Sequence, residues 1–417
     1  MKVGVFLSAK LPERGGGFTF ESELFDALTE LAPYSAHSFV ICSQEKETPQ
    51  QISSVKNIDF LSFHLSFQER WRYQLARVRK FLSIKLRHPR SKFKIEGWYD
   101  DFILKYVVEN GINFILYINP FYFYKSLLDL PYVTVLWDLQ HQLQPYFPEV
   151  SANDEWERRE KLYAVKLRRA STIITGTEAG KAEIERFYQV PTQRIRILPL
   201  PTPQFALDAP VCPDLSLLEK YNIPNNYLLY PAQFWSHKNH VGLLLAIKLL
   251  REKYNLIFPL VFIGSDRGNE LYVRQMVAEL ELSKQVHFLG FVPQEDLMHL
   301  YRDAFALTFV SFFGPDNLPP LEAMALQCPV IASNVSGAKE QLGDAALLVD
   351  PKDVEQIALA IKSLWDDSTL RQELIQRGLK RATKWRAIDY VKGICSILDE
   401  FEPIRRCWSS KELYQQK

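Results

Sequence analysis

Apolar runs of strand length alternate along this chain with segments whose apolar residues recur at helical spacing. Continuous apolar strands separated by helices are typical of parallel sheets covered on both faces. The pattern therefore predicts an α/β protein with two series of strands. The first series is 2–8, 38–43, 113–119, 132–138, 171–177 and 195–201, and the second is 227–232, 259–265, 286–292, 304–311, 329–333 and 346–350.

Between the two series, residues 199–215 hold five prolines and show neither a helical nor a strand period. Such a segment is typical of a linker between domains. We therefore expect two Rossmann-like domains of similar size with a cleft between them. Because ligands of open α/β sheets bind at the carboxyl ends of the strands, the cleft is the expected binding site.

Composition and charge exclude several classes of protein. The chain has 417 residues, 47% of them hydrophobic, and a net charge of +1, so no overall charge favours nucleic acid. Its five cysteines are scattered, which argues against a disulfide framework and for a reducing compartment. The apolar run Val3–Ala9 is too short for a confident signal peptide, and no run approaches the ~20 apolar residues of a spanning helix. We expect a cytoplasmic protein.

Residues 69–94 depart from the alternation, with ten Lys or Arg against one Glu. Trp71, Leu75, Val78 and Leu82 recur there at helical spacing. A basic amphipathic helix is a candidate for peripheral contact with an anionic membrane at the inner face. The alternative is a solvated helix that packs over its own domain through those apolar residues, and both remain open.

The strongest chemical signal is the segment FFGPDNLPPLEAMALQCPVIAS at 312–333. Asn or Asp just before a helix caps its free N–H groups, and Pro is tolerated in the first turn, so a helix should begin here. A helix N-terminus beside strand ends is a ready anion site. We expect the helix tip to hold a diphosphate and Glu322, one turn in, to hold a ribose. The residues of the tip are Asp316, Asn317, Leu318, Pro319 and Pro320.

Two further turns could contact the same ligand. Lys238 lies between the strand at 227–232 and a helix expected at 240–253, where it could neutralise a diphosphate and stabilise it as it leaves. Gly15, Gly16 and Gly17 follow the first strand and open a helix, and glycines let backbone approach a bound phosphate closely. Gly290 ends a strand and could let a nucleobase lie against the backbone.

The sequence LPPLEAMA at 318–325 resembles the nucleotide-sugar signature E-G-F-G-L-P-x-L-E-A-M-A of the family-4 retaining glycosyltransferases, also called glycosyltransferases group 1. The resemblance implies the GT-B fold of two Rossmann-like domains. It places an acceptor-side domain at 1–205 and a nucleotide-sugar-binding domain at 206–386, with a helix from about 387 to 417 returning to the first domain. It implies a retaining hexosyltransferase in polysaccharide biosynthesis. The donor would be GDP-mannose or a UDP-hexose, and the acceptor a glycan or glycolipid.

The resemblance also assigns residues. It implies catalytic roles for Lys238, Glu322 and His141, the last because the segment at 135–151 resembles a D-L-x-H pattern whose Asp138 and His141 should lie at the cleft edge. The chain departs from the family at Gly314, where the first Glu of the signature is expected, and at Gln233, where an Arg precedes the Lys. The implied donor-binding residues are Gly15, Gly16, Gly17, Gln233, Lys238, Gly290, Asp316, Asn317, Leu318, Pro319 and Glu322.

Metal-dependent glycosyltransferases usually hold their ion through an Asp-x-Asp element, which this chain lacks. We therefore expect metal-independent transfer with no cofactor. Two alternatives remain. The departures at Gly314 and Gln233 would suit a catalytically inactive GT-B-fold binding protein. Another GT-B enzyme, such as a nucleotide-sugar epimerase or a phosphorylase, would need an acidic and histidine set or a pyridoxal phosphate lysine that the sequence does not identify.

Overall fold

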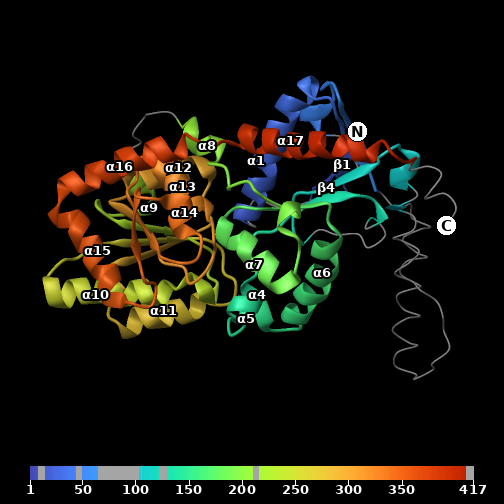
Figure 1. The fold of residues 1–417 in the computed structure, drawn as a ribbon. Coiled ribbons are helices and arrows are strands. Elements are labelled where there is room, and N and C mark those ends of the chain that lie inside the picture. Colours follow the sequence, from blue (N-terminus) through green and yellow to red (C-terminus); the bar gives the residue numbers. More distant parts are fainter. Residues whose placement is uncertain are drawn as a thin grey trace, which may run out of the picture.

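The computed structural model describes residues 1–7, 15–43, 49–63, 103–104, 106–121, 127, 129–209 and 216–409. Within this part, two parallel sheets lie side by side, each flanked by helices (Figure 1). The basic segment 69–94 lies outside the described residues, so its expected helix and membrane contact stay predictions. No helix in the described part is long and apolar enough to cross a membrane.

The first sheet has the strand order β3-β2-β1-β4-β5-β6-β7, and all neighbours are parallel. Its side chains alternate between two apolar clusters, one on each face: Val3 and Val5 of β1 lie in one, and Phe6 lies in the other. The strands are β1 (Lys2–Phe6), β2 (Ser38–Ser43), β3 (Ile58–Ser62), β4 (Phe114–Tyr117), β5 (Tyr132–Val135), β6 (Thr172–Thr175) and β7 (Ile195–Ile197).

The second sheet repeats this order as β10-β9-β8-β11-β12-β13, again all parallel. In both sheets the strand order therefore reverses beside the first strand, at β1/β4 and at β8/β11. Crevices at such switch points are where open α/β sheets bind ligands. The strands are β8 (Leu228–Pro231), β9 (Leu260–Ile263), β10 (Val286–Gly290), β11 (Ala306–Phe309), β12 (Val330–Ser333) and β13 (Ala346–Val349).

The predicted α/β class with two parallel sheets is confirmed, and a strand lies within each of the twelve predicted runs. The sequence pattern missed β3. This strand is at the edge of its sheet, and its residues IDFLS include an exposed Asp59. An edge strand pairs with only one neighbouring strand and can expose a side chain to solvent. Its sequence therefore lacks the continuous apolar run by which the other strands were predicted.

Helices cover both faces of the first sheet. One face carries α1 (Gly16–Leu31) and α17 (Ala387–Arg405), which pack on each other, and the opposite face carries α6 (Glu155–Arg169) and α7 (Glu178–Tyr188) (Figure 1). Because α17 follows the second sheet, the chain returns to the first domain at its end. Shorter helical turns are η2 (Ala32–Tyr34), η3 (Gln50–Ile52), α4 (Gln140–Leu143), α5 (Pro148–Ser151) and η5 (Thr192–Arg194).

The second sheet has one large apolar core, into which its helices pack. These are α9 (Ser216–Tyr221), α10 (His240–Tyr254), α11 (Glu270–Glu279), α12 (Gln294–Asp303), α13 (Leu318–Ala325), α14 (Ala338–Leu342), α15 (Val354–Asp366) and α16 (Ser368–Ala382). The short turn η6 (Ser236–Lys238) precedes α10. The expected helix at 240–253 is present as α10.

The segment between the sheets contains a helix that the sequence did not predict, α8 (Gln204–Leu207). The expectation of a linker without helix is therefore wrong at this point. The backbone N–H of Gln204 donates to Oε2 of Glu23 in α1 at 2.9 Å, so a carboxylate of the first domain caps this short helix. The predicted boundaries at 205 and 386 remain predictions, and the two sheets lie on either side of residue 205.

Candidate functional site

A cavity of about 780 Å³ lies between the two domains, at the carboxyl ends of both sheets. The first domain contributes the start of α1 and the residues after β5. The second domain contributes the residues after β8, β9, β10 and β11 and the start of α13. The cavity thus lies at both switch points, where sequence reasoning expected the cleft.

The glycine turn lies directly opposite the second domain. Gly15 is the N-cap of α1 with φ +78°, and the Cβ that it lacks would lie 3.5 Å from Nε2 of Gln233. A Cβ on Gly16 would lie 3.6 Å from Cδ1 of Leu318. Leu318, the first residue of α13, is itself buried against the apolar cluster of the first domain. The two turns therefore face each other across one edge of the cavity.

The start of α13 differs from the expected capping. Asn317 occupies the N-cap position, but its side chain makes no capping hydrogen bond. Its Nδ2 donates to the carbonyl of Gly314 at 3.0 Å, and its backbone N–H donates to Oε1 of Gln341 at 2.9 Å. The expectation that this side chain caps the helix is wrong. Because no side chain caps it, the positive end of the helix is left to the cavity.

Glu322 lies one turn further along α13 and lines the cavity with only 7% of its surface exposed. The Tyr301 hydroxyl donates to its Oε2 at 2.6 Å. Burial raises the pKa of Glu322 to about 7, although the hydrogen bond from Tyr301 opposes the shift. A buried carboxyl that is half-protonated near neutral pH is costly to the fold, and such groups cluster at functional sites.

Lys238 ends the turn η6 and lines the cavity. Its backbone carbonyl accepts a hydrogen bond from Tyr230, and its Nζ lies 4.8 Å from the ring centroid of Phe309. It is the only Lys or Arg among the described residues that line the cavity. Burial lowers the pKa of Lys238 to about 8, and Asp138 and Glu149 oppose this shift. The amine is therefore mainly charged at neutral pH but weakly solvated, so that it favours an anionic ligand.

Several carboxylates share the cavity, and one bridges the domains. A Cβ on Gly176 would lie 1.6 Å from Oδ2 of Asp316, so this carboxylate rests against the backbone of the first domain. Burial raises the pKa of Asp316 to about 7, and the negative charge of Asp138 is a second, smaller cause of this shift. The carboxylic residues of the lining are Glu23, Asp26, Asp138, Asp316 and Glu322.

His141 does not lie at the cleft edge, and that expectation is corrected. Its side chain is fully buried, with Nε2 3.2 Å from the Tyr188 hydroxyl and 3.5 Å from Glu160, and it does not line the cavity. The chain turns into α4 directly after Asp138, and this turn directs Asp138 to the cavity and His141 into the first-domain core. Burial lowers the pKa of His141.

Gly290 also lies outside the cavity lining, although Phe291 and Val292 directly after it belong to the lining. Its carbonyl accepts a hydrogen bond from the N–H of Gly264 at 2.8 Å. Gly264 is the glycine that the site requires, because at φ +148° a Cβ would lie 2.5 Å from the carbonyl oxygen of Ala232. The other ten of the eleven expected donor-binding residues all line this cavity.

Sequence reasoning missed several residues of the lining. Trp137 directly precedes Asp138 at the end of a predicted strand, and this position could have identified it. Glu23 and Asp26 lie three residues apart on the helix that the glycine turn opens, so helical spacing could have placed them together. Trp235 and Phe291 are aromatic residues just after strand ends.

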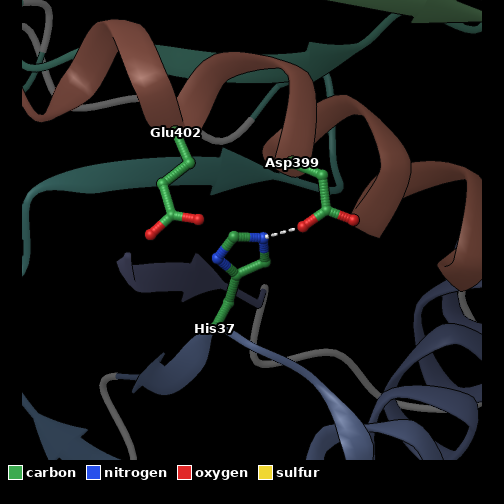
Figure 2. Close-up of side chains that lie close together, drawn as sticks. All are labelled: His37, Asp399 and Glu402. Atoms are coloured by element: carbon green, nitrogen blue, oxygen red, sulfur yellow. Dashed lines mark hydrogen bonds and ion pairs between the residues drawn. The ribbon is translucent and has the colours of Figure 1, made fainter.

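The described residues include one group of acidic and histidine side chains close enough to share a metal ion, and it lies elsewhere. Figure 2 shows His37 between Asp399 and Glu402 of α17. His37 Nε2 lies 2.9 Å from Asp399 Oδ1, and the Met1 amino group lies 3.1 Å from His37 Nδ1 and 3.6 Å from Glu402 Oε1. These contacts account for both nitrogens of the imidazole and hold α17 to the first sheet.

Comparisons with known proteins agree with this geometry. Residues 218–381 match the family model described as glycosyl transferases group 1. An O-antigen chain mannosyltransferase B of Escherichia coli is 32% identical over 57% of this chain and 63% of its own length. The O-antigen chain mannosyltransferase RfbU of Salmonella typhimurium is 30% identical over 54% of this chain and 59% of its own length. The chain thus spans about three fifths of these curated relatives.

Among solved structures, HepE of Anabaena, crystallised with UDP and glucose, superimposes with a TM-score of 0.69. The superposition covers 96% of this chain and 100% of that chain, with 15% sequence identity. At this identity the likeness concerns the fold, and the fold is GT-B.

Proposed function

We propose that this protein transfers mannose from GDP-mannose to a glycan or lipid-linked glycan acceptor, because residues 218–381 match the family model described as glycosyl transferases group 1. Both relatives described above are named mannosyltransferases of the O-antigen chain, which supports mannose over another hexose. A UDP-hexose donor is the alternative within the same proposal. The observation that carries it is one cavity in which Lys238, Glu322 and the glycine turn converge.

In this proposal, each wall of the cavity has a task. The nucleoside diphosphate lies along the second domain, with its ribose hydroxyls on Glu322 and its phosphates between Lys238 and the uncapped start of α13. The glycine turn at Gly15–Gly17 approaches the diphosphate from the first domain without Cβ atoms in the way. The acceptor reaches the sugar from the first-domain side, past Trp137 and Asp138.

The chemical step breaks the bond between the sugar C1 and the diphosphate oxygen and forms a bond from C1 to the acceptor oxygen. Negative charge grows on the leaving diphosphate, and Lys238 stabilises it there, together with the helix dipole of α13. The acceptor proton passes to the leaving phosphate. We propose retention of configuration, following the resemblance of LPPLEAMA to retaining enzymes, and metal-free transfer, because the chain has no Asp-x-Asp element.

Donor binding can be tested by thermal shift with a panel of nucleotide sugars. A ligand that binds only the folded state stabilises it by ~2.7 kcal/mol at 100 times its Kd. We expect GDP-mannose to raise the Tm of the parent and to raise the Tm of Glu322→Gln less at equal concentration. If only UDP-hexoses raised the Tm, the donor would be a UDP-hexose and not GDP-mannose. An unchanged Tm with every nucleotide sugar of the panel would contradict the proposal.

A second function, a GT-B-fold binding protein without turnover, is favoured by two positions. Gln233 brings no charge to the diphosphate site, where its Nε2 donates to Ser265 Oγ at 3.2 Å, and Gly314 offers no carboxylate to a sugar. Release of GDP from GDP-mannose without acceptor separates the two functions, since a binding protein would hold the donor intact. A cytoplasmic location, with peripheral membrane contact through 69–94, remains part of the proposal.

A further inference from the structure

One segment of the first domain, residues 144–149, contacts both loops of the second domain that lead to the proposed diphosphate site. We call it the bridge segment; it follows α4 and includes the first two residues of α5, Pro148 and Glu149 (Figure 1). Nε2 of Gln144 donates to the carbonyl of Phe312 at 3.0 Å. The ring of Phe147 packs on the rings of Phe312 and Phe313, each with a centroid distance of 5.6 Å. These contacts reach the loop that leads into α13.

Glu149 reaches the other loop, the one that carries Lys238. Its Oε1 accepts two hydrogen bonds from His237, from the backbone N–H at 2.8 Å and from ring Nδ1 at 2.5 Å. Side-chain exposure is 6% for Glu149 and 11% for His237. The imidazole also stacks on Phe313 with a centroid distance of 3.8 Å. A carboxylate of one domain therefore holds both the backbone and the ring of a cavity residue in the other.

Two observations indicate that stability alone does not explain this contact. Oε2 of Glu149 is buried and makes no hydrogen bond within the described part of the chain. A buried carboxylate with an unsatisfied oxygen is costly, and native structures retain such groups where they serve a site. His237 also links the two loops, because its carbonyl accepts from the N–H of Phe312 at 2.8 Å. The turn η6 is therefore held from two sides, by Glu149 and by the loop that leads into α13.

We propose that Glu149 is a positioning residue for Lys238. By holding His237 from the first domain, it fixes the turn η6 so that the next residue presents its amine to the cavity when the domains face each other. The inference rests on the proposed function, because it concerns the same site. It adds a first-domain residue through which domain closure and the orientation of the lysine are coupled.

The charge of Glu149 should affect the pH dependence of activity through the pKa of Lys238. A contact that only stabilised the fold would leave that pH dependence unchanged. Among the described residues, Asp138, Glu149, His237 and His240 interact electrostatically with Lys238, and the carboxyl groups of Asp316 and Glu322 share its cavity. Burial raises the pKa of Glu149, but the hydrogen bonds from His237 outweigh burial and the pKa is lowered. Burial lowers the pKa of His237 to about 4, so the pair is a carboxylate and a neutral imidazole at pH 7. Removing the carboxylate charge should lower the pKa of Lys238 below about 8.

The experiment compares Glu149→Ala and Glu149→Gln with the parent in GDP-mannose turnover across pH. A misplacement of about 1 Å can cost 10²-fold in rate, so we expect Glu149→Ala to lower kcat at least tenfold and to change the donor KM less than threefold. Glu149→Gln keeps an amide oxygen for both N–H groups and should recover most of kcat below pH 7. On the alkaline side of the pH profile, the activity of Glu149→Gln should nevertheless fall at a lower pH than that of the parent, because Lys238 loses its proton at a lower pH.

Glu340→Gln is the matched control. Glu340 is also a carboxylate of one domain that accepts from the other, from the N–H groups of Glu178 at 2.6 Å and Ala179 at 3.1 Å, but it does not line the cavity. If Glu149 acted only by holding the domains together, both Gln variants should behave alike. We expect the alkaline side of the pH profile to move in Glu149→Gln and to stay in place in Glu340→Gln.

A double-mutant cycle completes the test. Because Glu149 is proposed to act through Lys238, Glu149→Ala should cost less than twofold in a Lys238→Ala background. Equal losses in both backgrounds, or parent kinetics with an unmoved pH profile in both Glu149 variants, would overturn the inference while leaving the proposed function intact. If Glu149→Ala fails to fold, as judged by melting, Glu149→Gln carries the test.

If the parent protein turned over no nucleotide sugar, that result would contradict the proposed function instead. The inference is then decided by the pH dependence of Lys238 acylation, followed by mass spectrometry on the unliganded protein. The midpoint should lie at lower pH in Glu149→Gln than in the parent and in Glu340→Gln. The same midpoint in all three proteins would overturn it.

Discussion

The two walls of the cavity differ in how directly the sequence encodes them. In the second domain, Gln233, Lys238 and Glu322 line the cavity as expected. In the first domain, the glycine turn lines it, but His141 is buried in the core, while Trp137 contributes to the lining and Glu149 contacts the second domain instead. The comparison shows that the local sequence pattern predicts where residues of a strand–turn–helix unit lie. The place of residues that meet across the cleft depends instead on how the two domains dock.

The largest expected effect tests the second-domain wall. Lys238→Ala should lower kcat by ~10²–10³, because removing one electrostatic stabiliser of a transition state typically costs that much. The loss should fall on kcat more than on donor KM, since the diphosphate gains charge only as the bond breaks. Steady-state kinetics with GDP-mannose measure both. Lys248→Ala is the control, because Lys248 lies on α10, outside the cavity, 3.7 Å from Glu252. If Lys238→Ala kept the kcat of the parent, Lys238 would have no role in the chemical step.

Glu322→Gln should have the next largest effect, and on binding. Loss of a charged hydrogen bond to a ribose costs ~1.5–3 kcal/mol, or about 10- to 100-fold in the Kd of the nucleoside diphosphate. Titration calorimetry with GDP measures the change. The amide oxygen can still accept from Tyr301, so the fold should persist with a cooperative melt. An unchanged Kd would place the ribose elsewhere.

The same variant should show the opposite effect on stability, and only at higher pH. The pKa of Glu322 is about 7 in the fold and about 4.5 in the unfolded chain, so the folded state holds the proton longer. The parent therefore loses stability as pH rises from 4.5 through 7, by on the order of 3 kcal/mol. Glu322→Gln should have the higher Tm at pH 8 and no such advantage at pH 4. Parallel melting curves across this range would contradict the raised pKa.

Behind the first-domain wall, in the core of that domain, His141→Asn should separate structure from catalysis. The substitution leaves the partners Tyr188 and Glu160 without the ring nitrogen, which costs roughly 1–3 kcal/mol of stability. Because His141 lies outside the cavity, kcat should stay within about threefold of the parent at a temperature where both are folded. A large loss of kcat with unchanged stability would support the catalytic role expected for His141 and weaken the contrast between the walls.

The smallest expected effect concerns metal ions. Turnover of GDP-mannose should change less than twofold in excess EDTA, because Lys238 and the start of α13 are proposed to carry the charge of the diphosphate. Loss of activity on chelation with recovery in Mg²⁺ or Mn²⁺ would add a cation to the second-domain wall. The chelator is checked on a metal-dependent transferase in the same assay.

The sequence was sufficient for the sheets because buried parallel strands are continuous apolar runs, as at Phe114–Tyr117 (β4) and Leu260–Ile263 (β9). It was insufficient for β3, whose Asp59 is exposed at an edge, and for α8, whose first N–H group donates to Glu23 of the first domain, far away in sequence. Motif spacing placed Lys238 and Glu322, because each lies within one unit. Neither spacing nor periodicity could show that His237 would meet Glu149, since that contact joins positions 88 residues apart.

The most direct test of the central claim is a crystal structure of the protein with GDP bound. The account predicts the diphosphate within hydrogen-bond distance of Nζ of Lys238 and of the backbone at Leu318, with the ribose hydroxyls on Glu322 and the glycine turn facing the phosphates. GDP bound elsewhere, or bound in the cavity with its phosphates away from Lys238, would contradict it.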